Sequence, residues 1–286
     1  MSLDLHALVA AAAPDGMVDI PAGVHELTAT LHVPPNVTMR GAGLHRTVLR
    51  AATSMHSVIS MAAESVTIHR GSVSDLTCDA AGLASYGLRG LHLGRVAWSR
   101  VYASQGTAAA LMLEGCVHMR LTQVEGVASV SGLRMNVSPT GEPTRFIHVD
   151  GGVLQSNTYG FVVEHAAGIY LRGLEIDNNS HAGYAGEMCV TAEGLALVVD
   201  GCWCERNNGP ITLTSPQHAA ALHIIRDTLI VSGTNRPHGV AVYGGAIPLR
   251  YHIENVSAQN AVVTDYAQYG PCLRTTAGHV IGTANW

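Results

Sequence analysis

The feature that most constrains this chain is a repeated unit of three short strands separated by turns. Units begin near Val58, Tyr86, Ala109, Ser131, Gly160, Met188, Pro210, His238 and Ala261. A first strand reads like Gly160–Val163, and a third strand reads like Leu174–Asp177. The third strand usually ends in an asparagine, which predicts a stacked column of Asn157, Asn178, Asn207, Asn235, Asn260 and Asn285. One such unit cannot bury its apolar side alone, so neighbouring units must stack on one another.

Composition points the same way. The chain has 286 residues and is 47% hydrophobic, only 5% aromatic and 13% charged, with 31 glycines. Such a core consists of small and branched aliphatic side chains on many short strands. Turn positions favour Asn and Gly, because these residues adopt the left-handed backbone conformation at little cost. A β-sandwich would need two-residue hairpin turns, and a βαβ fold would need helices after residue 13; neither pattern is seen.

The N-terminal segment predicts the architecture more specifically. Ser2 is a predicted N-cap of a short helix that ends before Pro14. One face of this helix carries Leu5, Leu8, Val9 and Ala12, and would cover the first exposed strand edges. Short strands then alternate with Gly, Pro and Asn turns in Asp15–Gly23 and Pro34–Gly43. These two segments resemble the opening of right-handed parallel β-helix proteins of the pectate-lyase-like superfamily.

That resemblance implies an all-β chain in the form of a single-stranded right-handed parallel β-helix of roughly nine to ten coils. We expect one domain, 1–286, with a cap helix in 1–14 and coils in 15–286. No evident cap follows the last coil, so either a partner subunit covers it or the chain continues. A homo-oligomer, dimer or trimer, is one expectation.

Charge and spacing exclude several classes of function. The net charge is −5 and no basic run occurs, which argues against nucleic-acid binding. No apolar run reaches 18 residues, and no basic segment precedes the first apolar stretch, so we expect neither a membrane span nor a signal peptide. This favours a cytoplasmic protein, or one of a phage particle. The six cysteines lack framework spacing and predict buried, reduced thiols, and the histidines show no metal-ligand spacing, so no metal or cofactor is expected.

Candidate chemistry falls on the outward side of the third strands, where the resemblance implies that catalytic groups lie. Aligning these strands puts Asp177 beside Glu205 in one outward column, and puts Glu175 between Leu154 and Trp203 in the other. Two adjacent carboxylates cannot both ionise freely, which predicts a raised pKa for one of them and a general acid beside an ionised partner. Trp203 would stack on a sugar ring, and Arg206 would bind a carboxylate.

Two polar segments supply further candidates. A loop predicted at 178–187 offers His181 as a base and Tyr184 as a hydrogen-bond donor. Arg236 and His238 lie in a second predicted loop that would wall a substrate pocket. His148 and Asp150 share a strand face and are predicted to be structural, while His165 and His223 are predicted to be exposed strand residues.

Three functions remain open. The first is a polysaccharide lyase or glycoside hydrolase that acts on a glycan along the Asp177–Glu205 face. The second is a cyclase or isomerase of a small, partly apolar metabolite. The third is a non-catalytic structural or phage-tail-like β-helix. Asp-Pro-His-Asp and the other catalytic motifs of the superfamily's branches are missing from the sequence, so the resemblance implies a fold and transfers no catalytic residue.

Overall fold

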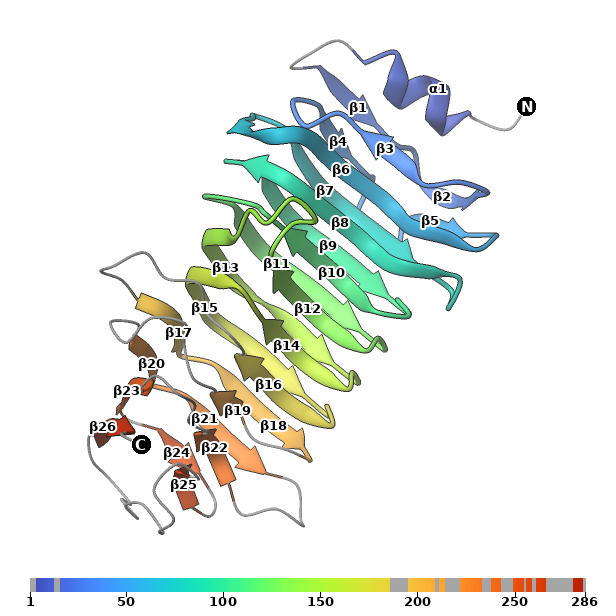
Figure 1. Ribbon diagram of the computed structural model, residues 1–286. Coiled ribbons are helices and arrows are strands. Elements are labelled where there is room, and N and C mark those ends of the chain that lie inside the picture. The colour runs from blue at the N-terminus through green and yellow to red at the C-terminus, as the bar shows by residue number, and fades with distance from the viewer. Residues whose placement is uncertain are drawn as a thin grey trace.

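The computed structural model is a parallel β-solenoid with one short N-terminal helix, α1 (Leu5–Ala10). Its coils stack along one axis from α1 at one end to the C-terminal strands at the other (Figure 1). The stack has about eight turns, slightly fewer than predicted. The structure describes residues 4–12, 16–185, 195–208, 211–213, 222–232, 238–242, 249–254, 256–258, 261–265 and 280–284.

The strands form two sheets. The path of the first sheet is β1 (Met17–Asp19), β4 (Thr38–Arg40), β7 (Ser72–Asp79), β9 (Ala97–Ser104), β11 (Arg120–Val127), β13 (Thr144–Gln155), β15 (Ala166–Asp177), β17 (Leu195–Asp200), β20 (Leu222–Arg226), β23 (Leu249–Glu254) and β26 (Val280–Ala284). Attached to it are β2 (Gly23–Leu27), β5 (Thr47–Ala51), β18 (Trp203–Asn207), β21 (Leu229–Ser232) and β24 (Ser257–Ala258). The second sheet contains β3 (Leu31–Val33), β6 (Met55–Ile68), β8 (Ala84–Gly94), β10 (Ala109–Glu114), β12 (Ser131–Asn136), β14 (Tyr159–Val163), β16 (His181–Ala185), β19 (Ile211–Leu213), β22 (His238–Val242) and β25 (Ala261–Asp265).

Each coil presents three outer faces. We call the second sheet face A. In the first sheet, face B is the part that aligns with residues 120–122 of β11, and face C is the part that aligns with residues 124–127. Between them β11 bends at Gln123, whose φ is 52°. Sixteen non-glycine residues of the described part have positive φ, and they lie at such corners between faces. The corners recur because each coil must turn at the same position as the coils stacked on either side of it.

Parallel register holds throughout the stack. β13 and β15 pair from Thr144–Ala166 to Gln155–Asp177, which places residues about one coil apart in sequence side by side. Among the described strands, the exception is β26, which pairs antiparallel with β23 at the C-terminal end of the first sheet. This reversed strand covers the edge of β23, and sequence analysis missed it because its sequence does not continue the repeat.

The interior is aliphatic, as composition predicts. One inward column on face B consists of Leu121, Val149, Leu171, Val199 and Ile225, all at most 1% exposed. The four described cysteines, Cys78, Cys116, Cys202 and Cys204, are buried free thiols, as predicted. Burial raises the pKa of Cys116 to about 12 and that of Cys202 to about 11, so these thiols remain protonated.

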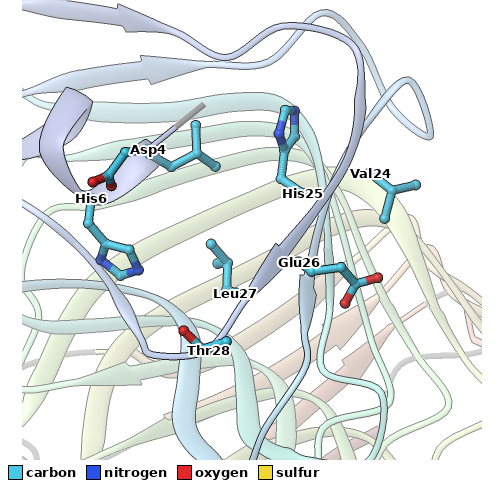
Figure 2. A pocket seen from close by; sticks show the side chains of 8 residues that line it. Asp4, His6, Val24, His25, Glu26, Leu27 and Thr28 are labelled. Atoms are coloured by element: carbon cyan, nitrogen blue, oxygen red, sulfur yellow. The ribbon is translucent and has the colours of Figure 1, made fainter. Parts of the chain in front are cut away.

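Helix α1 begins later than predicted. Asp4 is the N-cap, and its carboxylate accepts a hydrogen bond from the backbone N–H of Ala7 at 3.0 Å. Leu5 and Val9 are buried as predicted, but Leu8 is exposed. A cleft of about 540 Å³ separates the start of α1 from β2 (Figure 2).

An asparagine ladder fixes the corner from face C to face A. The backbone N–H of Asn157 donates to Asn179 Oδ1, and that of Asn179 donates to Asn207 Oδ1, both at 2.9 Å. The side-chain amides repeat the pattern, with Asn179 Nδ2 donating to Asn207 Oδ1 and to the Leu154 carbonyl, each at 2.9 Å. The predicted Asn column used Asn178, which is instead exposed at the left-handed corner position. Its predicted members at 235, 260 and 285 lie outside the described residues.

The residue after this corner must be small, which gives a first test. A Cβ atom on Gly160 would lie 2.4 Å from the Ala182 carbonyl oxygen and 2.5 Å from Ile176 Cγ2. We expect Gly160→Ala to destabilise the fold by about 1–3 kcal/mol, because neighbouring coils cannot separate locally. The measurement is the midpoint of denaturant unfolding.

Gly173→Asn is the matched control for this test. A side chain on Gly173 meets open space, and asparagine tolerates its φ of 59°. Equal unfolding midpoints for the Gly160→Ala variant and the wild type would show that neighbouring coils can shift to accommodate the added methyl group.

Candidate functional site

The predicted pairing of candidate residues is confirmed by the register of β15 and β18. Glu175 lies opposite Trp203, and Asp177 lies opposite Glu205. Further along face C the predicted column slips by one residue. Leu154 was predicted to point outward but is fully buried, and Val153 takes the outward position beside Glu175.

Asp177 and Arg206 form a bidentate ion pair in this region. The Asp177 side chain is 4% exposed, and Arg206 Nε donates to Asp177 Oδ1 at 2.9 Å while Nη2 donates to Oδ2. The hydrogen bonds and charge of Asp177 raise the pKa of Arg206. The bidentate fork of Arg206, predicted as a clamp for a ligand carboxylate, therefore holds Asp177 instead.

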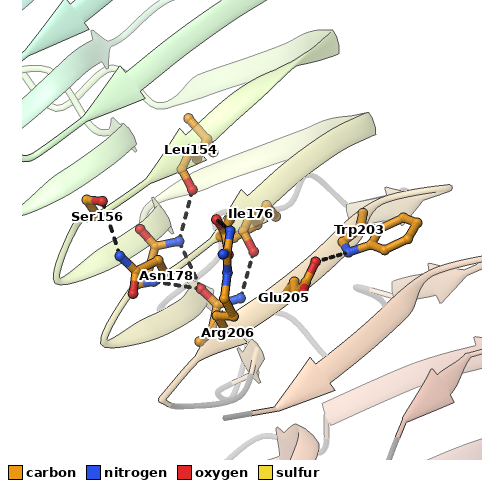
Figure 3. A network of polar contacts seen from close by, with 10 residues as sticks. Leu154, Ser156, Ile176, Asn178, Trp203, Glu205 and Arg206 are labelled. Atoms are coloured by element: carbon orange, nitrogen blue, oxygen red, sulfur yellow. Dashed lines mark hydrogen bonds and ion pairs between the residues drawn. The ribbon is translucent and has the colours of Figure 1, made fainter.

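Glu205 and Trp203 form the solvent-facing half of the region (Figure 3). Trp203 Nε1 donates to Glu205 Oε2 at 2.9 Å, and the Trp203 residue is 52% exposed. Glu205 is partly exposed and Glu175 is exposed. Face C thus carries two accessible carboxylates beside a large aromatic ring that is fixed at its polar edge.

His181 is not in a loop, contrary to the prediction for 178–187. It begins β16 on face A, its backbone N–H donates to the Thr158 carbonyl at 2.8 Å, and its ring stacks on Tyr159 with centroids 5.0 Å apart. The polar sequence Asn178–Ser180 is the tight corner itself, so the strand resumes at once. His181 consequently lies around the corner from the carboxylates of face C.

The remaining predicted site residues have the following places. Tyr184 belongs to β16, opposite Val162 and Thr212. His238 begins β22. For both, the description covers the strand backbone alone, and Arg236 lies outside the described residues. Their predicted roles in substrate binding therefore stay predictions.

Face B carries a cluster that sequence reasoning missed. The rings of His148 and Tyr170 stack with centroids 4.6 Å apart and planes 3° from parallel. They lie in one outward column with Arg120, whose Nε donates to Asp150 Oδ2 at 3.2 Å. We predicted His148 and Asp150 to be structural because no reactive partner follows them in sequence. The available signal was the strand column, which aligns His148 with Arg120 and Tyr170.

A second outward column of face B alternates in charge. Its members are Asp150, Arg172, Asp200, Arg226 and Glu254. Arg226 Nη2 donates to Asp200 Oδ2 at 2.9 Å, and Arg172 Nε lies 3.4 Å from the same oxygen. The hydrogen bond from Arg226, with the charges of both arginines, lowers the pKa of Asp200. Within this column Asp200 is held between the arginines of the two neighbouring coils and stays ionised.

Two further properties bear on the chemistry. Among the described residues, no three His, Cys, Asp or Glu side chains are grouped so as to hold a metal ion. Within the same residues, no helix is long and apolar enough to cross a membrane.

Comparison with known proteins identifies the fold. No protein-family model matches the chain, and no curated protein matches it. Among solved structures, it is similar to the A-module of the Azotobacter vinelandii mannuronan C-5 epimerase AlgE4, with 16% identity, coverage of 96% of this chain and 95% of that chain, and a TM-score of 0.53. An alginate lyase from Paenibacillus sp. str. FPU-7 shows 11% identity, 92% coverage of both chains and a TM-score of 0.52.

A third similar structure is PfbA, a surface adhesin of Streptococcus pneumoniae, with 8% identity, coverage of 97% of this chain and 92% of that chain, and a TM-score of 0.54. At identities this low, the similarity concerns the fold alone. The chain is a parallel β-helix protein, and the architecture implied by its opening segments is confirmed.

Proposed function

We propose that this protein is a carbohydrate-active β-helix enzyme, a polysaccharide lyase or a glycoside hydrolase, that acts on a glycan along face C. The observation that carries the proposal is Trp203, a half-exposed indole pinned by Glu205 and flanked by the exposed Glu175. An aromatic ring beside accessible carboxylates suits a sugar, whose C–H face packs on the ring while its hydroxyls bind acceptors. Two of the similar structures, the epimerase and the alginate lyase, bear names of carbohydrate-active enzymes.

The contacts assign different tasks to the two facing carboxylates. Asp177 is buried against Arg206 and acts as a fixed acceptor that positions this guanidinium at the surface. Glu205 Oε2 accepts a hydrogen bond from Trp203 and its side chain reaches solvent, so it is the group that transfers a proton to or from the glycan. Trp203 orients the sugar ring above it.

The test is turnover of a panel of anionic and neutral glycans by the wild type and by Glu205→Gln. Absorbance of unsaturated products reports elimination, and new reducing ends report hydrolysis. We expect a loss of about 10²-fold in kcat for Glu205→Gln, as for removal of a general acid or base. Trp203→Ala should raise KM more than it lowers kcat.

Glu26→Gln provides the control, because Glu26 is an exposed carboxylate on β2 in the first coil. Undiminished turnover by Glu205→Gln would exclude its role in proton transfer.

Non-catalytic glycan binding is the second candidate. The burial of Asp177 favours it, because only one carboxylate of the facing pair is then accessible to a substrate. Under this alternative the panel yields Trp203-dependent binding without any product.

A further inference from the structure

The loop 137–143 joins β12 to β13 and is longer than the same connection in the next coil, where residues 164–165 suffice between β14 and β15. The loop closes on itself, because the backbone N–H of Ser138 donates to the Glu142 carbonyl at 2.8 Å and that of Gly141 donates to the Ser138 carbonyl at 2.9 Å. Its extra length brings Thr140 into contact with β8, two coils earlier in the stack.

His92 of β8 is the residue that Thr140 meets, and it is only 5% exposed. Its Nδ1 lies 3.2 Å from the carbonyl oxygen of Ala63 in β6, and its Nε2 lies 3.0 Å from Thr140 Oγ1. A carbonyl oxygen can only accept a hydrogen bond, so Nδ1 carries the proton of the neutral ring and Nε2 is an acceptor. The Thr140 hydroxyl therefore donates its proton to His92 Nε2.

The directions of two further hydrogen bonds follow from this one. Ser138 Oγ lies 2.9 Å from Thr140 Oγ1. Because Thr140 donates its one hydroxyl proton to His92, Ser138 must donate to Thr140 Oγ1. Ser138 Oγ in turn accepts the backbone N–H of Glu142 at 3.0 Å. The result is a chain of donors that ends on an imidazole lone pair, and each hydrogen bond in such a chain polarises the next.

The accessibility of these groups suits a nucleophile and its base. Thr140 is exposed, whereas His92 and Ser138 are buried. A hydroxyl within hydrogen-bond reach of an imidazole, whose other nitrogen is fixed by a third group, is the usual arrangement of an activated nucleophile. The contact between His45 and Thr77 lacks it, because Thr77 is buried and its Oγ1 accepts the backbone N–H of His45 at 3.0 Å.

The coil between His92 and the loop is shaped to allow this contact. Gly115 follows β10, and a Cβ atom on it would lie 2.8 Å from Ser138 Cβ and 2.9 Å from His92 Cδ2. Its φ of 60° is left-handed, which glycine adopts at little cost. The missing side chain therefore lets the loop pack against His92 across the intervening coil.

A donor for developing negative charge lies beside the hydroxyl. The backbone N–H groups of Ser138, Gly141 and Glu142 all donate within the loop. Within the described residues, the N–H of Thr140 itself makes no hydrogen bond. In serine proteases the backbone N–H of the nucleophilic residue is one of the two donors that stabilise the tetrahedral oxyanion.

We propose that Thr140 is the nucleophile, and His92 the base, of an acyl-transfer site that hydrolyses carboxylic esters with a short acyl chain. The neighbouring Pro139 and Gly141 are exposed as well, so the site lacks the depth that a long acyl chain would need. This activity goes beyond the proposed function, because it uses neither Trp203 nor Glu205.

The reaction has two halves. Thr140 Oγ1 attacks the carbonyl carbon of the ester while His92 Nε2 takes the hydroxyl proton. The oxyanion then collapses, the bond from the carbonyl carbon to the alcohol oxygen breaks, and His92 gives the proton to the leaving alcohol. Water next attacks the acyl-threonine and loses a proton to His92 Nε2. The carboxylic acid leaves, and Thr140 Oγ1 recovers that proton.

The experiment uses p-nitrophenyl acetate. Absorbance measures the release of p-nitrophenolate, and peptide mass spectrometry after an acid quench measures acetyl groups on Thr140. We expect Thr140→Val to lower turnover about tenfold or more, the remainder being the reaction of surface histidines, and Thr140→Ser to retain it. His92→Gln should slow acetylation of Thr140 about 10²-fold and remove the rise in rate with pH that a titrating base produces.

Thr53→Val is the matched control, because Thr53 is an exposed threonine whose hydroxyl donates to the Thr28 carbonyl at 2.9 Å. It should hydrolyse the ester like the wild type. Far-ultraviolet circular dichroism reports whether each variant retains its coils. Thr140→Val changes an exposed side chain, so it remains informative if His92→Gln does not fold.

The outcomes separate this site from the proposed function. Acetylation of Thr140 that depends on His92 supports the site, whether or not Glu205→Gln affects glycan turnover. Wild-type protein without an acetyl group on Thr140, or equal turnover by Thr140→Val and the wild type, overturns it. Equal rates of Thr140 acetylation in His92→Gln and the wild type also overturn it. None of these results bears on the carboxylates of face C.

Discussion

Asn179→Ala is expected to destabilise the protein by about 4 kcal/mol, the largest effect of any single substitution considered. Asn179 Oδ1 accepts hydrogen bonds from Asn157 N at 2.9 Å and Asn157 Nδ2 at 3.1 Å, and its own amide donates to the Leu154 carbonyl. The alanine variant leaves the buried Asn157 N–H without its acceptor and removes the amide hydrogen bond to the Leu154 carbonyl, and each such loss costs about 1–3 kcal/mol. The measurement is the free energy of unfolding from denaturant titration.

The neighbouring residue provides the control. Asn178→Gly removes an exposed amide at a left-handed position where glycine is tolerated, so its effect should stay below about 1 kcal/mol. If the Asn178 and Asn179 variants lose similar stability, the buried ladder does not hold this corner together.

His223→Leu is expected to make the protein more resistant to acid. His223 is fully buried in β20, and within the described residues neither ring nitrogen has a hydrogen-bond partner. Burial lowers its pKa to about 4, whereas an unfolded histidine titrates near 6.5. Between these values the unfolded chain binds a proton that the native state excludes, so stability rises with pH.

The size of this effect follows from the two pKa values. Stability is full above about pH 6.5 and falls by up to about 3 kcal/mol as the pH drops to about 4. His223→Leu should remove this part of the pH dependence, measured as unfolding free energies between pH 4 and pH 7. His32→Gln, at an exposed position of β3, should leave the slope unchanged. An unaltered slope in the His223→Leu variant would contradict the assignment.

Much of the fold could be predicted because a stacked coil repeats one pattern many times. One wrongly placed strand does not change the period of the repeat. The position of Asp177 opposite Glu205 followed from that period. The details that failed are those decided within one or two residues. Asn178 and Asn179 are the same residue type, and only the corner conformation determines which one is buried.

Side-chain environment was harder to predict than register. His223 was predicted to be exposed because histidine is polar, yet it points into the core, opposite Leu197 of the previous coil. Arg206 was predicted to meet a ligand, but at its left-handed corner it folds back on Asp177. His223 follows a register irregularity in the pairing of β17 and β20, and Arg206 lies at a corner, and at both places regular strand alternation is interrupted.

The stacked corners around Phe146 show the same limit of sequence-based prediction. Phe146, His118 and Gly168 come from three successive coils and are far apart in sequence. Each is unremarkable alone, since corners accept many residue types. Only the superposition of corners shows that a glycine adjoins an exposed aromatic ring.

The left-handed corners have a consequence for how this protein loses its structure. Each of the sixteen non-glycine residues with positive φ would relax by about 1–2 kcal/mol once freed from its neighbours. An outermost coil has a neighbour on one side only, so fraying should start at the two ends and move inward. Helix α1 packs on β3 at one of these ends and the reversed strand β26 pairs with β23 at the other, so both should oppose unwinding of the end coils.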